Sequence, residues 1–191
     1  MEFQYIPRIN GVQLGGKPRL HSVELSDIMH PVLPIIVYTD GGCQGNPGPG
    51  AWAFVMRYGD RLKEASGFDP ATTNNKMELS AVIEALSFLA SRRGEVLPSS
   101  PSWLNAPIIV FTDSQYVKNG ITKWIRAWKA KGWKTSGKEP VKNRELWERL
   151  DSLAEGLRPE FRWVEGHAGI EDNERCDRLV RHTMESRRPL A

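Results

Sequence analysis

Four acidic residues lie at positions where burial of a charged side chain is expected to cost free energy. Asp40 and Asp113 each end an apolar run, at residues 35–39 and 108–112. Glu78 heads an apolar-periodic stretch, and Asp177 lies in a late helical stretch. A carboxylate that leaves water without a partner is costly, and converging carboxylates repel one another unless a cation lies between them. An all-oxygen ligand set favours a hard divalent ion, Mg²⁺ or Mn²⁺.

The basic residues are unevenly distributed. The chain has 26 Lys and Arg against 23 Asp and Glu, a net charge of +3. Residues 118–149 hold ten Lys or Arg and three Glu, so this segment carries +7 and the remainder −4. Such a segment is typical of a polyanion-binding region. An acidic metal site beside a basic, Trp-rich segment points to hydrolysis of a phosphodiester.

Bulk composition excludes several classes of protein. A chain of 191 residues predicts one domain, with room for an appendage. No apolar run approaches the ~20 residues of a membrane span, and the N-terminus has no secretory pattern. The two cysteines, Cys43 and Cys176, make neither a disulfide framework nor a zinc site. We therefore expect a cytoplasmic monomer that does not interact with membranes.

The order of elements predicts an α/β fold. Residues 1–33 are interpreted as an N-terminal extension of unknown role, and residues 34–191 as one domain with a basic protrusion at about 118–149. Strands are expected at 34–40, 51–58, 62–68, 107–113 and 161–165. A first helix is expected to have its N-cap among residues 72–75 and to run to about 91, and further helices are expected at 114–120, 122–130, 141–156 and 171–186. Residues 41–50 are expected to form a turn, because Gly and Pro are dense there, and 92–106 and 132–140 to form loops. This order predicts a five-stranded mixed sheet, antiparallel and then parallel, with helices packed on it and ligands beyond the strand ends.

Several motifs in the same order closely resemble type 1 ribonuclease H. The match spans about residues 34–186. The matching segments are Tyr38-Thr39-Asp40-Gly41-Gly42, Gly45-Asn46-Pro47-Gly48, Thr73-Asn74-Asn75-Lys76-Met77-Glu78, Thr112-Asp113-Ser114-Gln115-Tyr116, Gly166-His167-Ala168-Gly169 and Asn173-Glu174-Arg175-Cys176-Asp177. The Trp-rich and Lys-rich segment resembles the basic protrusion of many bacterial members.

The resemblance implies hydrolysis of the RNA strand in an RNA–DNA hybrid with two Mg²⁺ ions, or Mn²⁺ in their place, leaving 5′-phosphate and 3′-hydroxyl ends. The family's acidic ligands correspond to Asp40, Glu78, Asp113 and Asp177, and its mobile-loop histidine to His167. Residues implied to contact the hybrid are Gly41, Gly42, Cys43, Asn46, Thr73, Asn74, Gln115, Trp124, Trp128, Lys129, Lys131, Trp133, Lys134 and Lys142.

Other interpretations stay open at the level of sequence. Trp at helical spacing is more often a core residue, so at least two of the protrusion's four Trp are expected to pack internally. A histidine in a loop is also compatible with a purely structural hydrogen bond. Alternatives to a hybrid-specific endonuclease are a transposase-type or exonuclease domain of related fold, and a hybrid-binding protein without catalysis.

Overall fold

The computed structural model describes residues 33–94 and 106–187. The expected N-terminal extension, except Leu33, and most of the expected loop at 92–106 lie outside the described residues. None of the helices within the described ranges is long and apolar enough to cross a membrane.

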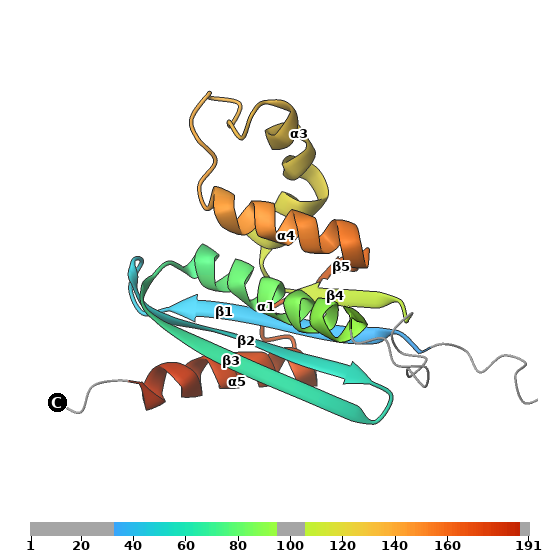
Figure 1. Cartoon of the computed structure of the whole chain (residues 1–191). Coiled ribbons are helices and arrows are strands. Elements are labelled where there is room, and N and C mark those ends of the chain that lie inside the picture. Colours follow the sequence, from blue (N-terminus) through green and yellow to red (C-terminus); the bar gives the residue numbers. More distant parts are fainter. Residues whose placement is uncertain (1–32, 95–105, 188–191) are drawn as a thin grey trace, which may run out of the picture. The chain divides into compact units, whose positions relative to one another are not determined.

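A mixed sheet of five strands forms the centre of the fold, as the sequence predicted (Figure 1). Its strands are β1 (Ile35–Cys43), β2 (Gly48–Tyr58), β3 (Arg61–Thr72), β4 (Ile108–Thr112) and β5 (Glu160–Trp163). Their spatial order is β3-β2-β1-β4-β5. The pairs β1–β2 and β2–β3 are antiparallel, while β1–β4 and β4–β5 are parallel. The central strand β1 therefore joins the two halves of the sheet.

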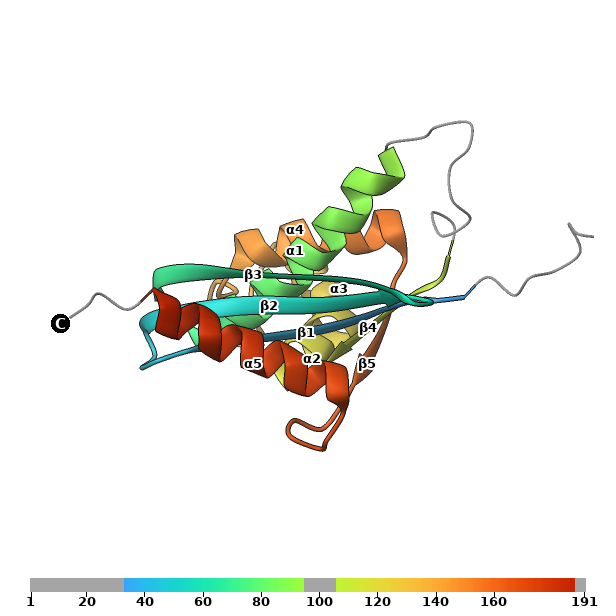
Figure 2. The same ribbon diagram turned by 90° about the horizontal axis from the view of Figure 1, so that it is seen from below.

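Helices cover both faces of this sheet. The helices are α1 (Asn74–Gly94), α2 (Gln115–Asn119), the π-helical turn η3 (Gly120–Trp124), α3 (Ile125–Ala130), α4 (Arg144–Leu157) and α5 (Glu171–Ser186). Helix α1 packs on one face with α4 behind it, and α5 crosses the opposite face (Figures 1 and 2). The main core lies between α1 and the sheet, where Leu79, Val82 and Leu86 are fully buried against Val37 and Val110.

The expected turn at residues 41–50 is mostly strand, and this prediction was wrong. Strand β1 continues to Cys43, β2 begins at Gly48, and only residues 44–47 form the turn. Gly41 pairs with Trp52 across the two strands. Its glycine reflects a close approach of helix α1, because a Cβ at this position would lie 2.5 Å from the backbone nitrogen of Glu78. Close packing of α1 against β1 therefore requires glycine at position 41.

The basic protrusion consists of α2, η3, α3, the following loop and α4. Helix α4 begins three residues later than the sequence suggested, because Asn143 adopts the left-handed conformation (φ 57°) and makes no capping bond. Its side-chain amide donates instead to the Tyr116 hydroxyl, at 3.3 Å. Trp147 is fully buried beside Gly120, where a Cβ would overlap the indole ring. Trp147 belongs to the same core cluster as Leu79 and Val110, so the protrusion packs onto the main core through its aromatic residues.

Candidate active site

The four carboxylates predicted from sequence come together at one end of the sheet. Asp40 lies in β1, and Asp113 immediately follows β4, the parallel neighbour of β1. Glu78 comes from the start of α1 and Asp177 from α5. Burial, together with the charges of Asp113, Asp177 and Glu78, raises the pKa of Asp40 to about 7, against a hydrogen bond from the Gly41 backbone. Asp40 is therefore close enough to the other three carboxylates to be repelled by them.

Glu78 is fixed by two hydrogen bonds from side chains. The Ser114 hydroxyl donates to Oε2 at 2.6 Å, and the Asn74 amide donates to Oε1 at 3.2 Å. Burial raises the pKa of Glu78, and the charge of Asp113 adds to this effect, while the Ser114 bond opposes it. Ser114 also caps α2 by accepting from the Val117 backbone nitrogen at 3.1 Å. One hydroxyl therefore orients a carboxylate and begins a helix.

Asp113 and Asp177 are also held by neighbours. The Asn173 amide donates to Asp113 Oδ2 at 3.3 Å. The indole of Trp163, which is half exposed, donates to the Asp113 backbone carbonyl at 3.0 Å. Arg181 Nη2 forms an ion pair with Asp177 Oδ2 at 2.6 Å, one helical turn along α5. The contacts of Asn173 and Arg181 limit how the two carboxylates can turn, and the Trp163 contact fixes the backbone at Asp113.

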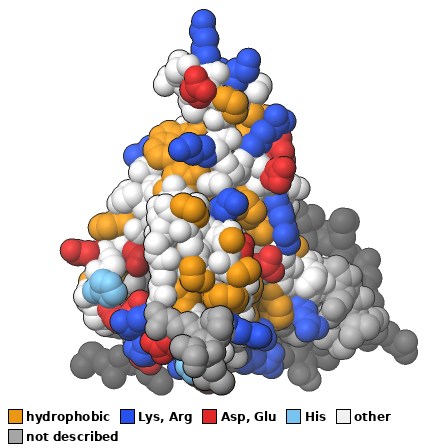
Figure 3. Space-filling view, turned by 90° about the vertical axis from the view of Figure 1, so that its left-hand side faces the viewer, with side chains coloured by type: hydrophobic (Ala, Val, Ile, Leu, Met, Phe, Trp, Pro, Cys, Tyr) orange, Lys and Arg blue, Asp and Glu red, His pale blue; other side chains and the backbone are white. Residues whose placement is uncertain are grey.

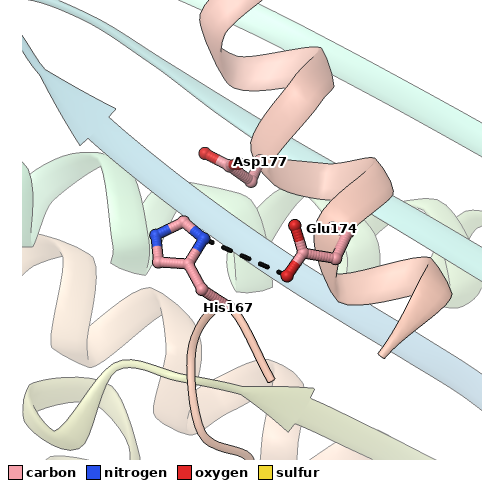
Figure 4. Close-up of side chains that lie close together, drawn as sticks. All are labelled: His167, Glu174 and Asp177. Carbon is pink, nitrogen blue, oxygen red and sulfur yellow. Dashed lines mark ion pairs between the residues drawn. The ribbon is translucent and has the colours of Figure 1, made fainter. Parts of the chain in front are cut away.

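His167 lies on an exposed loop before α5, with a positive φ of 57°. Its Nδ1 is 4.0 Å from Glu174 Oε1 (Figure 4). Asp177 completes this group, and the possible ligand atoms of the three residues lie within 4.8 Å of one another. The histidine thus stands at the edge of the acidic site, where the sequence resemblance placed it.

The donor chemistry of this end of the sheet fits a divalent cation. Its ligands are carboxylate oxygens, which hard ions prefer. Burial, followed by the charges of Asp113, Asp177 and Glu78, raises the pKa of Asp40, and a bound cation would offset this repulsion. Asp40, Glu78, Asp113 and Asp177 would hold such an ion.

Residues expected to contact the hybrid near the site have different surroundings. Gly41, Gly42 and Cys43 belong to β1, and Asn46 lies in the exposed turn that follows. Thr73 immediately precedes α1, with its hydroxyl 3.4 Å from the Lys76 backbone nitrogen. Asn74 is engaged with Glu78, whereas Gln115 is exposed at the start of α2 and bonds Asn119. Of these residues, Gly41 and Asn74 contact carboxylates of the site, and the contacts of the whole set with a hybrid stay a prediction.

The Trp residues of the protrusion divide into packing and surface residues. Trp147 is fully buried and donates to the Tyr116 hydroxyl at 3.0 Å. Trp128 and Trp133 are half-buried and pack against the core cluster. Trp124 is the most exposed of the four, at 38%. The expectation that at least two of them pack internally is confirmed.

The Lys residues of the protrusion also differ from one another. Lys129 Nζ forms ion pairs with Asp151 at 2.5 Å and Glu155 at 2.9 Å, so its charge is already neutralised. Lys131 and Lys134 line a shallow cavity of about 200 Å³ together with Trp124 and Trp128. Lys142 is exposed. Figure 3 shows Lys and Arg side chains over the protrusion, and acidic side chains lower on the same face beside a histidine.

Sequence reasoning did not single out Ser114, Asn173, Trp163 or Arg181. Ser114 has a partial signal, since a serine between a strand and a helix is a typical N-cap. Its bond to Glu78 joins positions 36 apart, and Asn173 reaches Asp113 across 60 positions. Such long-range partners have no periodic signature in the sequence.

The fold and this acidic site together define an RNase H-type nuclease domain. The RNase H family model matches residues 33–185, so the chain belongs to the RNase H family, type 1, and is a nuclease. Ribonuclease H of Neisseria gonorrhoeae is 50% identical over 147 residues, which cover 77% of this chain and 92% of that protein. Ribonuclease HI of Caulobacter vibrioides is 48% identical over 157 residues, covering 81% and 95%.

Solved structures show the same architecture. LC9-RNase H1, a type 1 RNase H with the type 2 active-site motif, has a TM-score of 0.66 at 30% identity, covering 83% of this chain and 75% of that one. LC11-RNase H1 in complex with an RNA/DNA hybrid has a TM-score of 0.57 at 25% identity, covering 80% and 97%. The predicted fold class is thus confirmed, as is the family resemblance.

Proposed function

We propose that this protein hydrolyses the RNA strand of RNA–DNA hybrids as an endonuclease, leaving 5′-phosphate and 3′-hydroxyl ends. The observation that carries the proposal is the convergence of four carboxylates from four elements, with the pKa of Asp40 raised to about 7. A nuclease with this donor set is suited to metal-assisted displacement at phosphorus. Its relatives are ribonucleases H, and LC11-RNase H1 has been solved with a hybrid bound.

The proposed roles follow from how the carboxylates are held. Asp40, Glu78, Asp113 and Asp177 would bind two Mg²⁺ ions, or Mn²⁺ in their place. When bound, these ions supply an activated water and stabilise the developing charge on the leaving oxygen. The hydrogen bonds from Ser114 and Asn74 orient Glu78 before substrate arrives. Preorganisation of this kind costs no rearrangement during the reaction.

His167 is proposed to assist proton transfer or product release. Its ring lies on a loop next to Glu174 and Asp177, and its side chain is 77% exposed. An exposed imidazole on a short loop can approach and leave a bound phosphate. Gly166 and Gly169 flank it on either side, which gives the loop freedom to move.

Selection of the RNA strand is proposed to depend on its 2′-hydroxyl, the group that distinguishes RNA from DNA at a given position. Gly41 to Cys43, Asn74 and Gln115 are the proposed contacts with that strand, and Gly41 and Asn74 also bond carboxylates of the site. The DNA strand would pass Asn46 and Thr73 and then the protrusion, where Trp124, Lys131 and Lys134 present an open, basic surface. Contacts with backbone and groove shape carry little base preference.

The proposal is tested with an end-labelled RNA–DNA hybrid in Mg²⁺, compared with duplex RNA, duplex DNA and an EDTA control. We expect metal-dependent cleavage of the RNA in the hybrid alone, and removal of the new 5′-phosphate by phosphatase should shift the fragments on a gel. Binding of the hybrid without cleavage would contradict the proposal and favour a non-catalytic hybrid-binding protein. Light scattering of the free protein checks the expected monomer.

A further inference from the structure

The first turn of α5 is held to the sheet by a partly buried salt bridge. Arg57 in β2 donates through Nε to Asp172 Oδ2 at 2.6 Å and through Nη2 to Oδ1 at 2.8 Å. The Asp172 side chain is only 11% exposed. Two parallel charge-assisted bonds fix both the distance and the orientation of a carboxylate. The pair therefore fixes the rotation of α5 about its own axis.

The residue after Asp172 faces the acidic site. Asn173 is 3% exposed, and its side chain lies 3.3 Å from Asp113 Oδ2. A carboxylate only accepts hydrogen bonds, so the amide N–H must face Asp113. This donor occupies one oxygen of Asp113 and prevents the group from turning, while the other oxygen stays available to a cation.

We propose that Asn173 is a positioning residue for Asp113, and that the Arg57–Asp172 pair holds Asn173 in place. The inference rests on the proposed function, because it assigns Asp113 to metal binding. Groups behind a metal ligand orient it before the ion arrives, and their loss lowers metal affinity or activity by about 10- to 100-fold. Arg57 and Asp172 thereby act on the site without touching substrate or metal.

A second salt bridge on the same helix provides a matched control. Arg175 Nε lies 2.6 Å from Glu64 Oε2 in β3, the same distance as the shorter bond of the Arg57 pair. Both pairs tie α5 to the sheet. The Arg175–Glu64 pair is more exposed, at 35% and 36%, and neither residue has a hydrogen bond to any of the four carboxylates among the described residues. A purely stabilising role predicts similar effects from both pairs.

The test compares Asn173→Leu, Arg57→Lys and the control Arg175→Lys in the full-length protein. Three quantities are measured: the Mg²⁺ concentration for half-maximal hybrid cleavage, the Mn²⁺ affinity of the hybrid-free protein by calorimetry, and the thermal midpoint. We expect the first two variants to need about tenfold more Mg²⁺ and to bind Mn²⁺ about tenfold more weakly. The Arg175→Lys variant should change the thermal midpoint alone.

The double variant Arg57→Lys with Asn173→Leu tests whether Arg57 acts on the site through Asn173. If Arg57 works through Asn173, the double variant should bind Mn²⁺ as weakly as Asn173→Leu alone. Additive losses, wild-type Mn²⁺ affinity in Asn173→Leu, or an equal loss in Arg175→Lys would overturn the inference. If Asn173→Leu does not fold, Asn173→Ser replaces it.

The two proposals can fail separately. If the wild-type protein binds Mn²⁺ but does not cleave the hybrid, the proposed function fails, and calorimetry still decides the role of Asn173.

Discussion

The acidic site and the basic protrusion hold their functional side chains in different ways. In the acidic site, buried or half-buried carboxylates are each fixed by named partners, such as Ser114 for Glu78 and Asn173 for Asp113. In the protrusion, buried Trp147 and the aromatic rings around it hold the backbone, while Lys131 and Lys134 extend into solvent. The acidic site thus fixes the positions of individual carboxylate oxygens, whereas the protrusion presents a basic surface whose side chains are free to adjust.

This difference predicts how strongly amino-acid substitutions in each region affect activity or binding. Metal chemistry depends on the geometry of each ligand, so a single substitution in the site should have a large effect. Binding to a phosphate backbone depends on the number of charges, so single substitutions in the protrusion should have small effects that accumulate.

The largest effect is expected from Asp40→Asn, which removes a proposed metal ligand. Loss of about 4 kcal/mol of transition-state stabilisation lowers the rate by about 10³-fold. Because the substitution also removes repulsion toward the other carboxylates and toward phosphate, hybrid affinity should be retained and metal-free stability should rise. Single-turnover cleavage and filter binding measure the two effects. Cleavage at the wild-type rate would show that the site is wrongly assigned.

A second effect concerns pH without metal. The folded-state pKa of Asp40, about 7, lies above its ordinary value of 3.8, so the folded protein binds this proton more tightly than the unfolded chain. Asp40 therefore makes stability fall as pH rises from about 4 to 7, by on the order of 2–4 kcal/mol. Urea denaturation at pH 5 and pH 8 in EDTA measures this fall. Asp40→Asn should remove most of it, and an unchanged slope in that variant would contradict the assignment.

A third prediction tests the close approach of α1 to β1. In Gly41→Ala the new methyl group would overlap the backbone at Glu78, which we expect to cost about 1–3 kcal/mol of stability and to displace Glu78. The control for stability is Gly42→Ala, whose nearest neighbours would be 3.7 Å away. Thermal denaturation of both variants checks the difference. Equal thermal midpoints for the two variants would show that β1 moves away from α1 to accommodate the methyl group at position 41, and would contradict the prediction.

The smallest effects are expected from Lys substitutions in the protrusion, so three are combined. Changing Lys131, Lys134 and Lys142 together to Gln should raise KM for the hybrid. It should also reduce the slope of the logarithm of the hybrid binding constant against the logarithm of salt concentration, by about 0.7–0.9 for each phosphate that is no longer neutralised. Lys129→Gln should change this slope little, because Asp151 and Glu155 already neutralise its charge. Hybrid affinities over a series of salt concentrations measure both. A large change in slope for Lys129→Gln would show that Lys129 contacts the hybrid despite its ion pairs, and would contradict the prediction.

Much of this architecture was predictable from sequence. Apolar runs that end in Asp40 and Asp113 identified two adjacent strands, and the periodic stretch after Glu78 identified α1. Helix α5 was expected at the residues where it occurs. The mixed sheet of five strands and the convergence of the acidic residues were also expected, whereas the spatial order of the strands came from the structure.

The errors have a common physical cause. Gly41 and Gly42 resemble turn residues by composition, yet both lie in β1. At Gly41 the backbone of helix α1 occupies the space that a side chain would need. Asn143 occupies the N-cap position of α4, yet its side chain makes no capping bond and donates to Tyr116 from a left-handed backbone, and the helix begins only after it. In both cases a tertiary contact decided the local structure. Contacts between positions far apart, such as Ser114 with Glu78, escaped prediction for the same reason.

The four carboxylates come from β1, α1, the end of β4 and α5, elements spread over most of the described chain. A partly folded chain that lacks any one of these elements lacks a ligand. Hybrid cleavage would therefore report on completion of the whole fold, and a fluorescent hybrid could follow refolding in real time or select well-folded variants from a library.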